Sequence, residues 1–305
     1  MPPGPTGYAG GMRTRTIGND TVGRLEVGAI GLGLMTFDQT GPQPREQLAE
    51  TVKAALDAGV TLFDTADAYG PGGDLGAQAQ GENERLIASL LDELGVRDRV
   101  TLATKGGHVR TDGGGWDTDS SPAHLRHAVD DSLQRLGVEQ LTLWQHHRPD
   151  PAVAYDDVID TLSDIADSGK VRMIGLSNAD EDQIRKAHKV LGDRLVSVQN
   201  QFSPRFRSSR REIDVCAELG LAFLPWSPLG GLSNAKQLAQ EHPAFAEIAE
   251  ARGISPQRVA LAWELAQSEV VIPIPGAKHA ESIRDSAAAA DLDLTQEELS
   301  RLDAG

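Results

Sequence analysis

Three residues that can carry acid–base chemistry recur in the sequence at an almost constant spacing. Asp64, Lys105 and His147 are 41 and 42 residues apart, and each follows or ends a short apolar run. Such runs, rich in β-branched residues, predict buried strands. Equivalent positions on successive parallel strands lie at one edge of a sheet, so we expect the three side chains to face one point. Tyr69 follows in the loop after Asp64.

A phenol, an ammonium, a carboxylate and an imidazole around one point are suited to carbonyl chemistry. The ammonium lowers the pKa of the phenol, the carboxylate holds the ammonium, and the imidazole orients a carbonyl. Together they can protonate the alkoxide that forms when a carbonyl is reduced. Of the other tyrosines, Tyr8 lies in an expected leader and Tyr155 in an expected helix. Tyr69 is therefore the predicted proton donor.

The surrounding sequence predicts the elements that would position these residues. From residue 25 onward, apolar runs alternate with amphipathic segments of helix length, which is typical of βα units around a parallel sheet. Eight units predict an α/β fold of one domain, a closed (β/α)8 TIM barrel over residues 13–305, after a flexible leader at 1–12. The predicted strands are 27–32, 60–64, 99–104, 141–146, 171–176, 195–199, 221–225 and 270–273.

Local signals agree with this number of units. Ser121 and Ser255 are each followed by proline, which predicts an N-cap and the first helical residue. Gly137 stands where a helix should end. Two long glycine-rich connections, 70–81 and 106–120, follow strands two and three, so both should open on the face where such barrels carry their active sites.

Composition limits the classes of function. A net charge of −16 argues against nucleic acid as a partner, because binding a polyanion requires clustered Lys and Arg. No apolar run has the length of a membrane span and no secretory signal is present, so we expect a cytoplasmic protein with no membrane contact. The single cysteine, Cys216, allows neither a disulfide nor a cysteine metal site.

The sequence also resembles the aldo-keto reductase family, over roughly residues 20–303. This family comprises nicotinamide-dependent oxidoreductases on a TIM barrel, and some members serve as auxiliary subunits of ion channels. The resemblance therefore implies a chemistry more firmly than a substrate. Seven motifs in order carry it: FDTADAYG (63–70), ATKGG (103–107), HRPDP (147–151), GLSN (175–178), VQNQFS (198–203), PWSPLGGL (225–232) and IPGAK (274–278).

The resemblance implies a catalytic tetrad of Asp64, Tyr69, Lys105 and His147. Two adjacent histidines compete for the last place. The histidine of the family directly precedes an Arg-Pro-Asp turn, which selects His147. His146 would then face the other side of its strand as a packed or hydrogen-bonded side chain.

The resemblance further implies NADPH as the cofactor, with NADH as the alternative. Ser177, Asn178 and Gln199 would hold the nicotinamide carboxamide, and the indole of Trp226 would stack on the ring. Lys278, in the motif that opens the last helices, would meet the ribose 2′-phosphate. The expected cofactor contacts are Gly33, Met35, Ser177, Asn178, Gln199, Trp226, Ser227, Pro228, Leu229, Gly231, Gly276, Lys278, Ser282 and Ser286.

The stretch GAIGLGLMTF (28–37) suggests a different dinucleotide-binding motif, but it lacks one of the required glycines. Thr36 occupies the third glycine position of GxGxxG. We expect Gly31 and Gly33 instead to let the first barrel strand approach the cofactor closely.

The expected reaction moves a hydride between the nicotinamide C4 and an aldehyde or ketone, with Tyr69 as general acid or base. We expect this small-molecule substrate near Phe37, Tyr69, Trp116 and His147, with Trp116 acting as a lid or as a packing anchor. The Asp, Gly and Gln content of the two long connections favours polar substrates such as sugars or polyols. The sequence leaves the oligomeric state open.

Two other functions stay open at this point. A regulatory subunit that binds the cofactor without turnover would carry the same tetrad. A metal-dependent hydrolase would use histidine ligands, but no His-x-His follows the first strand and two candidates fall on one expected helix, so we expect no metal site. The available histidines are His108, His124, His127, His146 and His147.

Overall fold

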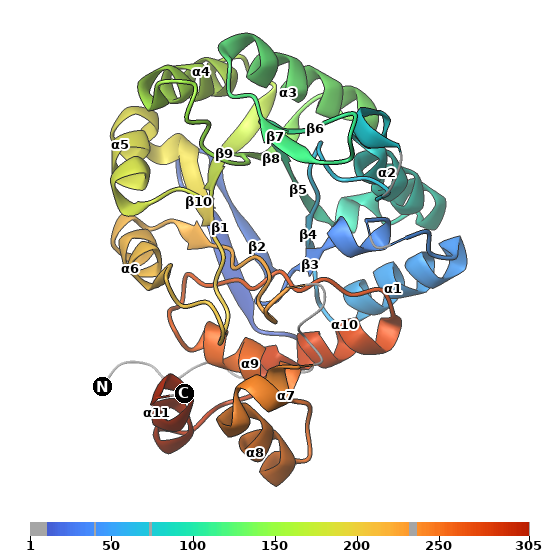
Figure 1. Cartoon of the computed structure of the whole chain (residues 1–305), viewed down its shortest axis with the longest axis vertical. Helices are drawn as coiled ribbons and strands as arrows, with labels where there is room; N and C mark the ends of the chain where they lie inside the picture. Colours follow the sequence, from blue (N-terminus) through green and yellow to red (C-terminus); the bar gives the residue numbers. More distant parts are fainter. Residues whose placement is uncertain (1–10, 40, 73–74, 232–236, 305) are drawn as a thin grey trace.

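The computed structural model describes residues 11–39, 41–72, 75–231 and 237–304. Its centre is a curled sheet of parallel strands in the order β11-β10-β9-β8-β5-β4-β3, surrounded by helices (Figure 1). This is the α/β TIM-barrel architecture that the sequence predicts. The strands are β3 (Leu32–Gly33), β4 (Leu62–Asp64), β5 (Thr101–Gly106), β8 (Leu141–His146), β9 (Val171–Ser177), β10 (Leu195–Gln199) and β11 (Ala222–Phe223).

The segment that completes the barrel in the place of an eighth strand forms single β-bridges, although a regular strand is predicted at 270–273. Val271 bridges Phe223 at one edge of the sheet, and Gly276 bridges Gly33 at the other. A Cβ atom on Gly33 would lie 2.8 Å from the carbonyl oxygen of Ile274. The small size of Gly33 therefore lets the two edges of the barrel meet, and its close approach to the cofactor stays a prediction.

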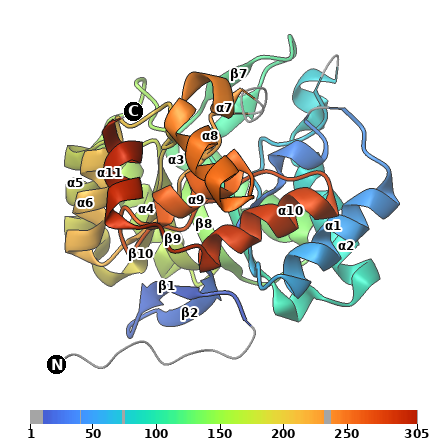
Figure 2. The same ribbon diagram turned by 90° about the horizontal axis from the view of Figure 1, so that it is seen from below.

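The predicted first strand, 27–32, has the wrong bounds. β1 (Thr14–Asn19) and β2 (Gly23–Gly28) pair as an antiparallel hairpin, and β3 begins only at Leu32. Ile17 and Val27 of the hairpin pack against the apolar residues inside the barrel, so the hairpin closes the end opposite β7 (Figure 2). The apolar run continues across both elements, and for that reason periodicity does not reveal the boundary.

Helices cover the outer face of the sheet, where their apolar sides form the larger core. The predicted caps are confirmed: the hydroxyls of Ser121 and Ser255 accept backbone N–H bonds, and Gly137 ends its helix with a φ of 66°. The helices are α1 (Arg45–Asp57), α2 (Glu82–Leu94), α3 (Pro122–Leu136), α4 (Tyr155–Asp167), α5 (Glu181–Leu191), α6 (Arg210–Leu219), α7 (Leu238–Glu241), α8 (Pro243–Arg252), α9 (Pro256–Leu265), α10 (Ala280–Ala287) and α11 (Gln296–Ala304).

The two long connections contact each other above the carboxyl ends of the strands. The second of them carries a hairpin of β6 (His108–Arg110) and β7 (Trp116–Thr118). The backbone N–H of Arg110 donates to Gln80 Oε1 at 3.0 Å, and its guanidinium donates to the carbonyl of Gly70 at 3.0 Å. These bonds fix the hairpin beside the loop that carries Tyr69.

The amino-terminal segment is only partly described. Residues 1–10 of the predicted leader lie outside the described residues, whereas Met12 is half-buried and packs against the core. None of the described helices combines the length and the apolar character of a membrane span.

Candidate active site

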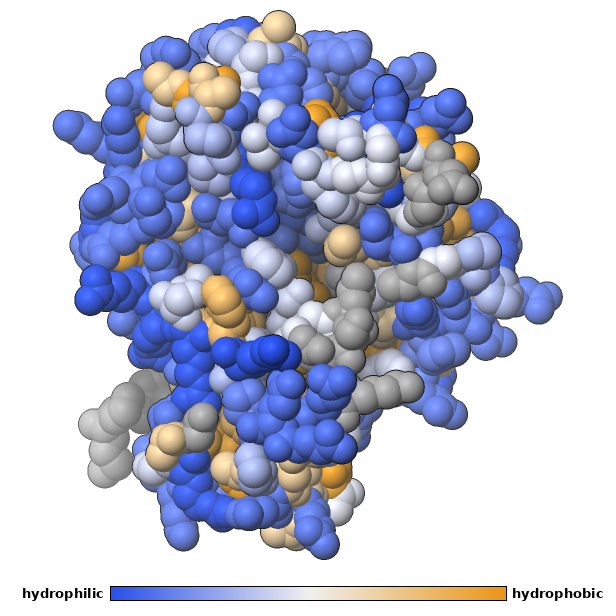
Figure 3. Space-filling model, in the orientation of Figure 1, coloured by the Kyte–Doolittle hydropathy of each residue, from blue (hydrophilic) through white to orange (hydrophobic). Residues whose placement is uncertain are grey.

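A pocket of about 690 Å³ opens at the carboxyl ends of the barrel strands. Figure 3 views the molecule onto this face, which is hollowed near its middle. Asp64, Tyr69 and His147 contribute to the pocket wall, while Lys105 lies fully buried behind them. The predicted tetrad is therefore brought together at one point.

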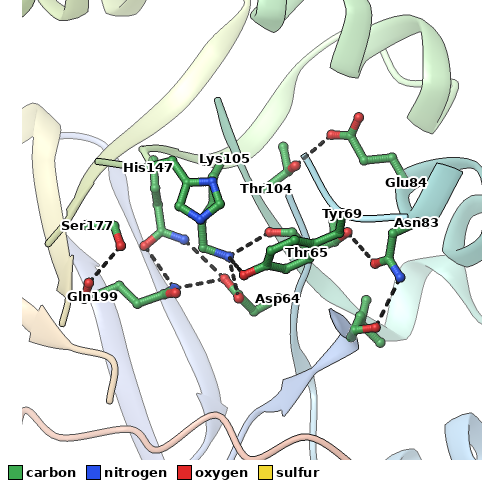
Figure 4. Close-up of polar contacts among 12 residues, drawn as sticks. Asp64, Thr65, Tyr69, Asn83, Glu84, Thr104, Lys105, His147, Ser177 and Gln199 are labelled. Carbon is green, nitrogen blue, oxygen red and sulfur yellow. Dashed lines mark hydrogen bonds and ion pairs between the residues drawn. The ribbon is translucent and has the colours of Figure 1, made fainter. Parts of the chain in front are cut away.

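Lys105 is the centre of this group. Its ammonium donates to Asp64 Oδ2 at 2.6 Å and to the carbonyl of Thr65 at 2.8 Å, and its Nζ lies 3.5 Å from the hydroxyl oxygen of Tyr69 (Figure 4). Lys105 projects from β5, and Asp64 ends the neighbouring strand β4. The carboxylate compensates the buried positive charge, so the ammonium can lie against the phenol.

Burial and charge act in opposite directions on these two groups. Burial alone would lower the pKa of Lys105, but Asp64 and Tyr69 outweigh it and raise that pKa, so the side chain stays an ammonium. Burial raises the pKa of Tyr69, and Lys105 offsets only part of the rise. The sequence predicts a lowered pKa for the phenol of Tyr69. Because burial outweighs the ammonium, the net direction is upward and the phenol keeps its proton at neutral pH.

The His147 ring lies beside the phenol as a neutral imidazole. The two ring centres are 5.8 Å apart and the planes meet at 78°. Burial, followed by the positive charge of Lys105, lowers the pKa of His147 well below its usual range. His146 points away and its Nε2 lies 2.8 Å from the Ser120 hydroxyl. It is thus a hydrogen-bonded side chain on the other side of the strand, as predicted.

Two glutamines complete the surroundings of Asp64. Gln145 Nε2 donates to Asp64 Oδ1 at 3.1 Å, and Gln199 Nε2 donates to the same oxygen at 2.9 Å. Gln199 was predicted as a cofactor contact, but Gln145 was missed. Its position two residues before His147 could have placed it beside the tetrad, since alternate residues of a strand point to the same face.

The predicted carboxamide-binding residues form a connected group. Ser177 Oγ donates to the carbonyl of Gln199, and Asn178 Nδ2 donates to the carbonyl of His147 and to Ser177 Oγ. Among the described residues, Asn178 and Ser227 are the non-glycine residues with positive φ, at 57° and 51°. Left-handed backbone is costly away from glycine, and such residues cluster at functional sites. Both line the pocket.

The family model of the aldo/keto reductase family matches residues 29–305, which is most of the chain. The chain belongs to the aldo/keto reductase family. It is accordingly an NAD(P)-dependent oxidoreductase.

Relatives cover nearly the whole length of the reductase. It is 37% identical over 274 residues to a 6-dehydroglucose reductase of Novosphingobium aromaticivorans, with 87% of each chain covered. It is 32% identical to a probable aldo-keto reductase of Glycine max, with 90% of this chain and 84% of that protein covered.

Solved structures share the fold. An aldo-keto reductase of Klebsiella pneumoniae in complex with NADPH superposes with a TM-score of 0.78 at 25% identity, covering 96% of this chain and 95% of that one. A second structure from the same organism, in complex with NADP and acetate, gives a TM-score of 0.75 at 25% identity, with 92% and 91% covered.

All but one of the cofactor contacts expected for the reductase line the pocket. Ser286 is the exception: it is buried and lies one turn beyond Ser282 in α10. Leu232, at the end of one motif, lies outside the described residues. Lys278 and Ser282 line the wall together with His279, which the sequence argument did not select.

The β6–β7 hairpin contributes two aromatic side chains to the wall of the pocket. The rings of His108 and Trp116 stack with centres 4.8 Å apart, and both line the pocket with Arg148. Burial lowers the pKa of His108 to about 4, so this imidazole is neutral. Phe37 was predicted at the substrate, but it is only 1% exposed and packs in the core, because η1 (Leu34–Phe37) turns its side chain inward.

The histidines do not assemble into a metal centre within the part of the chain that the structure describes. There, no group of three or more His, Cys, Asp and Glu side chains is placed to hold a metal ion. Cys216 is buried and unpaired, and burial raises the pKa of its thiol.

Proposed function

We propose that this reductase transfers a hydride from NADPH to an aldehyde or ketone, with Tyr69 donating the proton to the carbonyl oxygen. The observation that carries the proposal is the single ammonium of Lys105, which contacts both Asp64 and the phenol at the pocket wall. A phenol held next to a charged ammonium can give up its proton as negative charge develops on a neighbouring oxygen.

Each member of the tetrad has a task in this proposal. NADPH, when bound, supplies the hydride. Tyr69 keeps its proton at neutral pH because burial raises its pKa. Lys105 stabilises the phenolate that remains after transfer, and Asp64 keeps Lys105 charged. His147 is neutral and donates an N–H to the carbonyl oxygen, which orients the carbonyl toward Tyr69.

The pocket fits a phosphorylated dinucleotide. Ser177, Asn178 and Gln199 offer amide and hydroxyl groups that suit a carboxamide, and the indole of Trp226 supplies an aromatic face beside them. Lys278 and Ser282 stand at the start of α10, where backbone N–H groups favour a phosphate. This cation is our reason for proposing NADPH in preference to NADH.

The substrate side favours a polar carbonyl compound, and we propose a sugar-type aldehyde. Trp116 is 36% exposed and stands beside neutral His108, so an aromatic surface and a hydrogen-bonding ring are adjacent. Arg148, exposed at the pocket wall, adds donors for hydroxyl groups. The similarity to a 6-dehydroglucose reductase supports this class.

The test is a panel of sugar aldehydes, simple aldehydes and ketones, assayed by oxidation of NADPH and of NADH. We expect carbonyl-dependent turnover, highest kcat/KM for sugar-type aldehydes, and a lower KM for NADPH than for NADH. If the purified protein binds NADPH tightly but turns over no carbonyl, the proposal is wrong and a regulatory, cofactor-binding role takes its place. Best activity on apolar aldehydes would overturn the substrate class alone.

A further inference from the structure

Gln145 is a buried polar side chain that the tetrad mechanism does not use. It lies on β8, opposite Lys105 of β5 in the parallel register, and has no exposed surface. Its Nε2 donates to Asp64 Oδ1 at 3.1 Å, and its Oε1 accepts from Gln199 Nε2 at 3.3 Å. One amide thus connects the carboxylate of the tetrad with an expected cofactor contact.

The next strand makes room for this side chain. A Cβ atom on Gly175 of β9 would lie 2.7 Å from Gln145 Cγ and 2.5 Å from Ser197 Oγ. Real Cβ atoms do not approach other atoms so closely, so any other residue at position 175 would displace both Ser197 and Gln145. The absence of a side chain at Gly175 lets the amide reach across the barrel interior.

The two oxygens of Asp64 have different partners. Oδ2 accepts from the ammonium of Lys105, and Oδ1 accepts from the two glutamine amides. Neutral amide donors stabilise the carboxylate without introducing a second positive charge near the phenol of Tyr69. Such donors also hold the carboxylate plane in one orientation.

We propose that Gln145 is a positioning residue of the reductase, fixing Asp64 so that its carboxylate keeps Lys105 charged and directed at Tyr69. This inference rests on the proposed function. We expect Gln199 to form some of its hydrogen bonds with the cofactor when the cofactor is bound. Gln145 then remains as the amide donor that stays on Asp64.

The groups around Asp64 show what the amide of Gln145 does. Lys105 faces Asp64 from β5, Tyr69 lies in the loop after β4, and neutral His147 lies just after β8. Without the amide of Gln145, the carboxylate of Asp64 would lose a fixed donor and could turn away from Lys105. The ammonium would then no longer be held against the phenol of Tyr69.

The experiment compares Gln145→Met with the wild type in kcat and in NADPH affinity. Methionine keeps the volume and removes the amide. We expect kcat to fall roughly tenfold, in line with the loss of a hydrogen bond to a charged group. NADPH affinity should change much less than kcat.

Two further variants separate positioning from general damage. Ser197→Ala removes a buried hydroxyl that has no hydrogen-bond partner among the described residues, next to the same site, and should behave as the wild type. Gly175→Ala should lower kcat with little change in NADPH affinity, as Gln145→Met does, and it serves as the test if Gln145→Met does not fold.

The outcomes are distinguishable from failure of the proposed function. A wild-type kcat in Gln145→Met, or an equal loss in Ser197→Ala, overturns the positioning role while Lys105→Met still abolishes turnover. If Lys105→Met is as active as the wild type, the proposed function itself fails.

Discussion

Thr104 and Lys105 are neighbours on β5, yet their side chains enter two different buried clusters. Lys105 joins the barrel-side cluster, formed with Asp64, Gln145 and Gln199. Thr104 faces the helices and donates to Glu84 Oε1 at 2.6 Å in the helix-side cluster, the group that Glu84 and Thr104 form with Arg135 and Asp131. Figure 4 shows Lys105 with Asp64 and Gln199 in one group and Thr104 with Glu84 in the other.

Both clusters contain a buried carboxylate and a cation, but only one opens on a pocket. In the helix-side cluster, Arg135 lies 3.1 Å from Glu84 and 3.0 Å from Asp131, and none of these residues lines the pocket. In the barrel-side cluster, Lys105 reaches Tyr69 at the pocket wall. Burial of charge is therefore common to both clusters and does not identify the candidate active site. The barrel-side cluster differs because it reaches the pocket wall through Tyr69.

The largest effect should come from removing the cation of the barrel-side cluster. Lys105→Met is expected to lower kcat about 10³-fold, because Tyr69 loses the charge that stabilises its phenolate. Steady-state kinetics measure this, with the exposed Lys53→Met variant as the control that should keep wild-type activity. If kcat falls by less than about tenfold, the barrel-side cluster does not contribute to catalysis in the way that separates it from the helix-side cluster.

Removing the cation of the helix-side cluster should instead affect folding. Arg135→Met leaves the fully buried Glu84 uncompensated and is expected to lower the free energy of unfolding by about 3 kcal/mol. Because burial already raises the pKa of Glu84, the loss should shrink as the pH falls and the carboxyl takes up a proton. Chemical denaturation at several pH values measures it.

The matched control is Arg126→Met on the same helix. Its partner Asp164 is exposed, so the loss should stay below about 1 kcal/mol. The folded fraction of Arg135→Met should keep wild-type kcat. A large fall in kcat would mean that the helix-side cluster takes part in the chemistry after all.

The sequence predicts the barrel-side cluster better than the helix-side one for a physical reason. Asp64, Lys105 and His147 end successive strands, and strand ends converge wherever a parallel barrel closes. Glu84 and Arg135 lie on two helices, and their pairing depends on how α2 and α3 pack against each other. No spacing along the chain records that packing.

Other differences have the same origin. The boundary between β2 and β3 was misplaced because one apolar run serves both the hairpin that includes Val27 and the barrel strand at Leu32. Phe37 was assigned to the substrate because an aromatic after a strand is compatible with either a pocket or a core. The direction of the pKa shift of Tyr69 depends on how deeply its side chain is buried, which the sequence alone does not reveal.

The cofactor end of the pocket should show a smaller effect. Lys278→Met is expected to raise the Kd for NADPH about tenfold, as one charge-assisted contact to a phosphate is lost. The Kd for NADH should stay the same, because NADH lacks the 2′-phosphate. If the Kd values for NADPH and NADH rise equally, Lys278 does not act through the 2′-phosphate.

The smallest effect is expected from pH near neutrality. The pKa of His147 lies well below its usual range and that of His108 is about 4, so neither ring gains a proton between about pH 6 and 8. Burial raises the pKa of Tyr69, so the proton donor is lost only at alkaline pH. The rate of carbonyl reduction should be flat in that interval and fall only at more strongly alkaline pH, where Tyr69 loses its proton. A histidine titration near neutrality would contradict this.

The most direct test of the central claim is the single-turnover rate of hydride transfer in Tyr69→Phe with NADPH bound. Phenylalanine keeps the ring beside His147 and removes only the hydroxyl next to Lys105. We expect a rate about 10²- to 10⁴-fold below wild type with an unchanged Kd for NADPH. A rate close to that of the wild type would show that another group donates the proton and that Tyr69 is not the general acid.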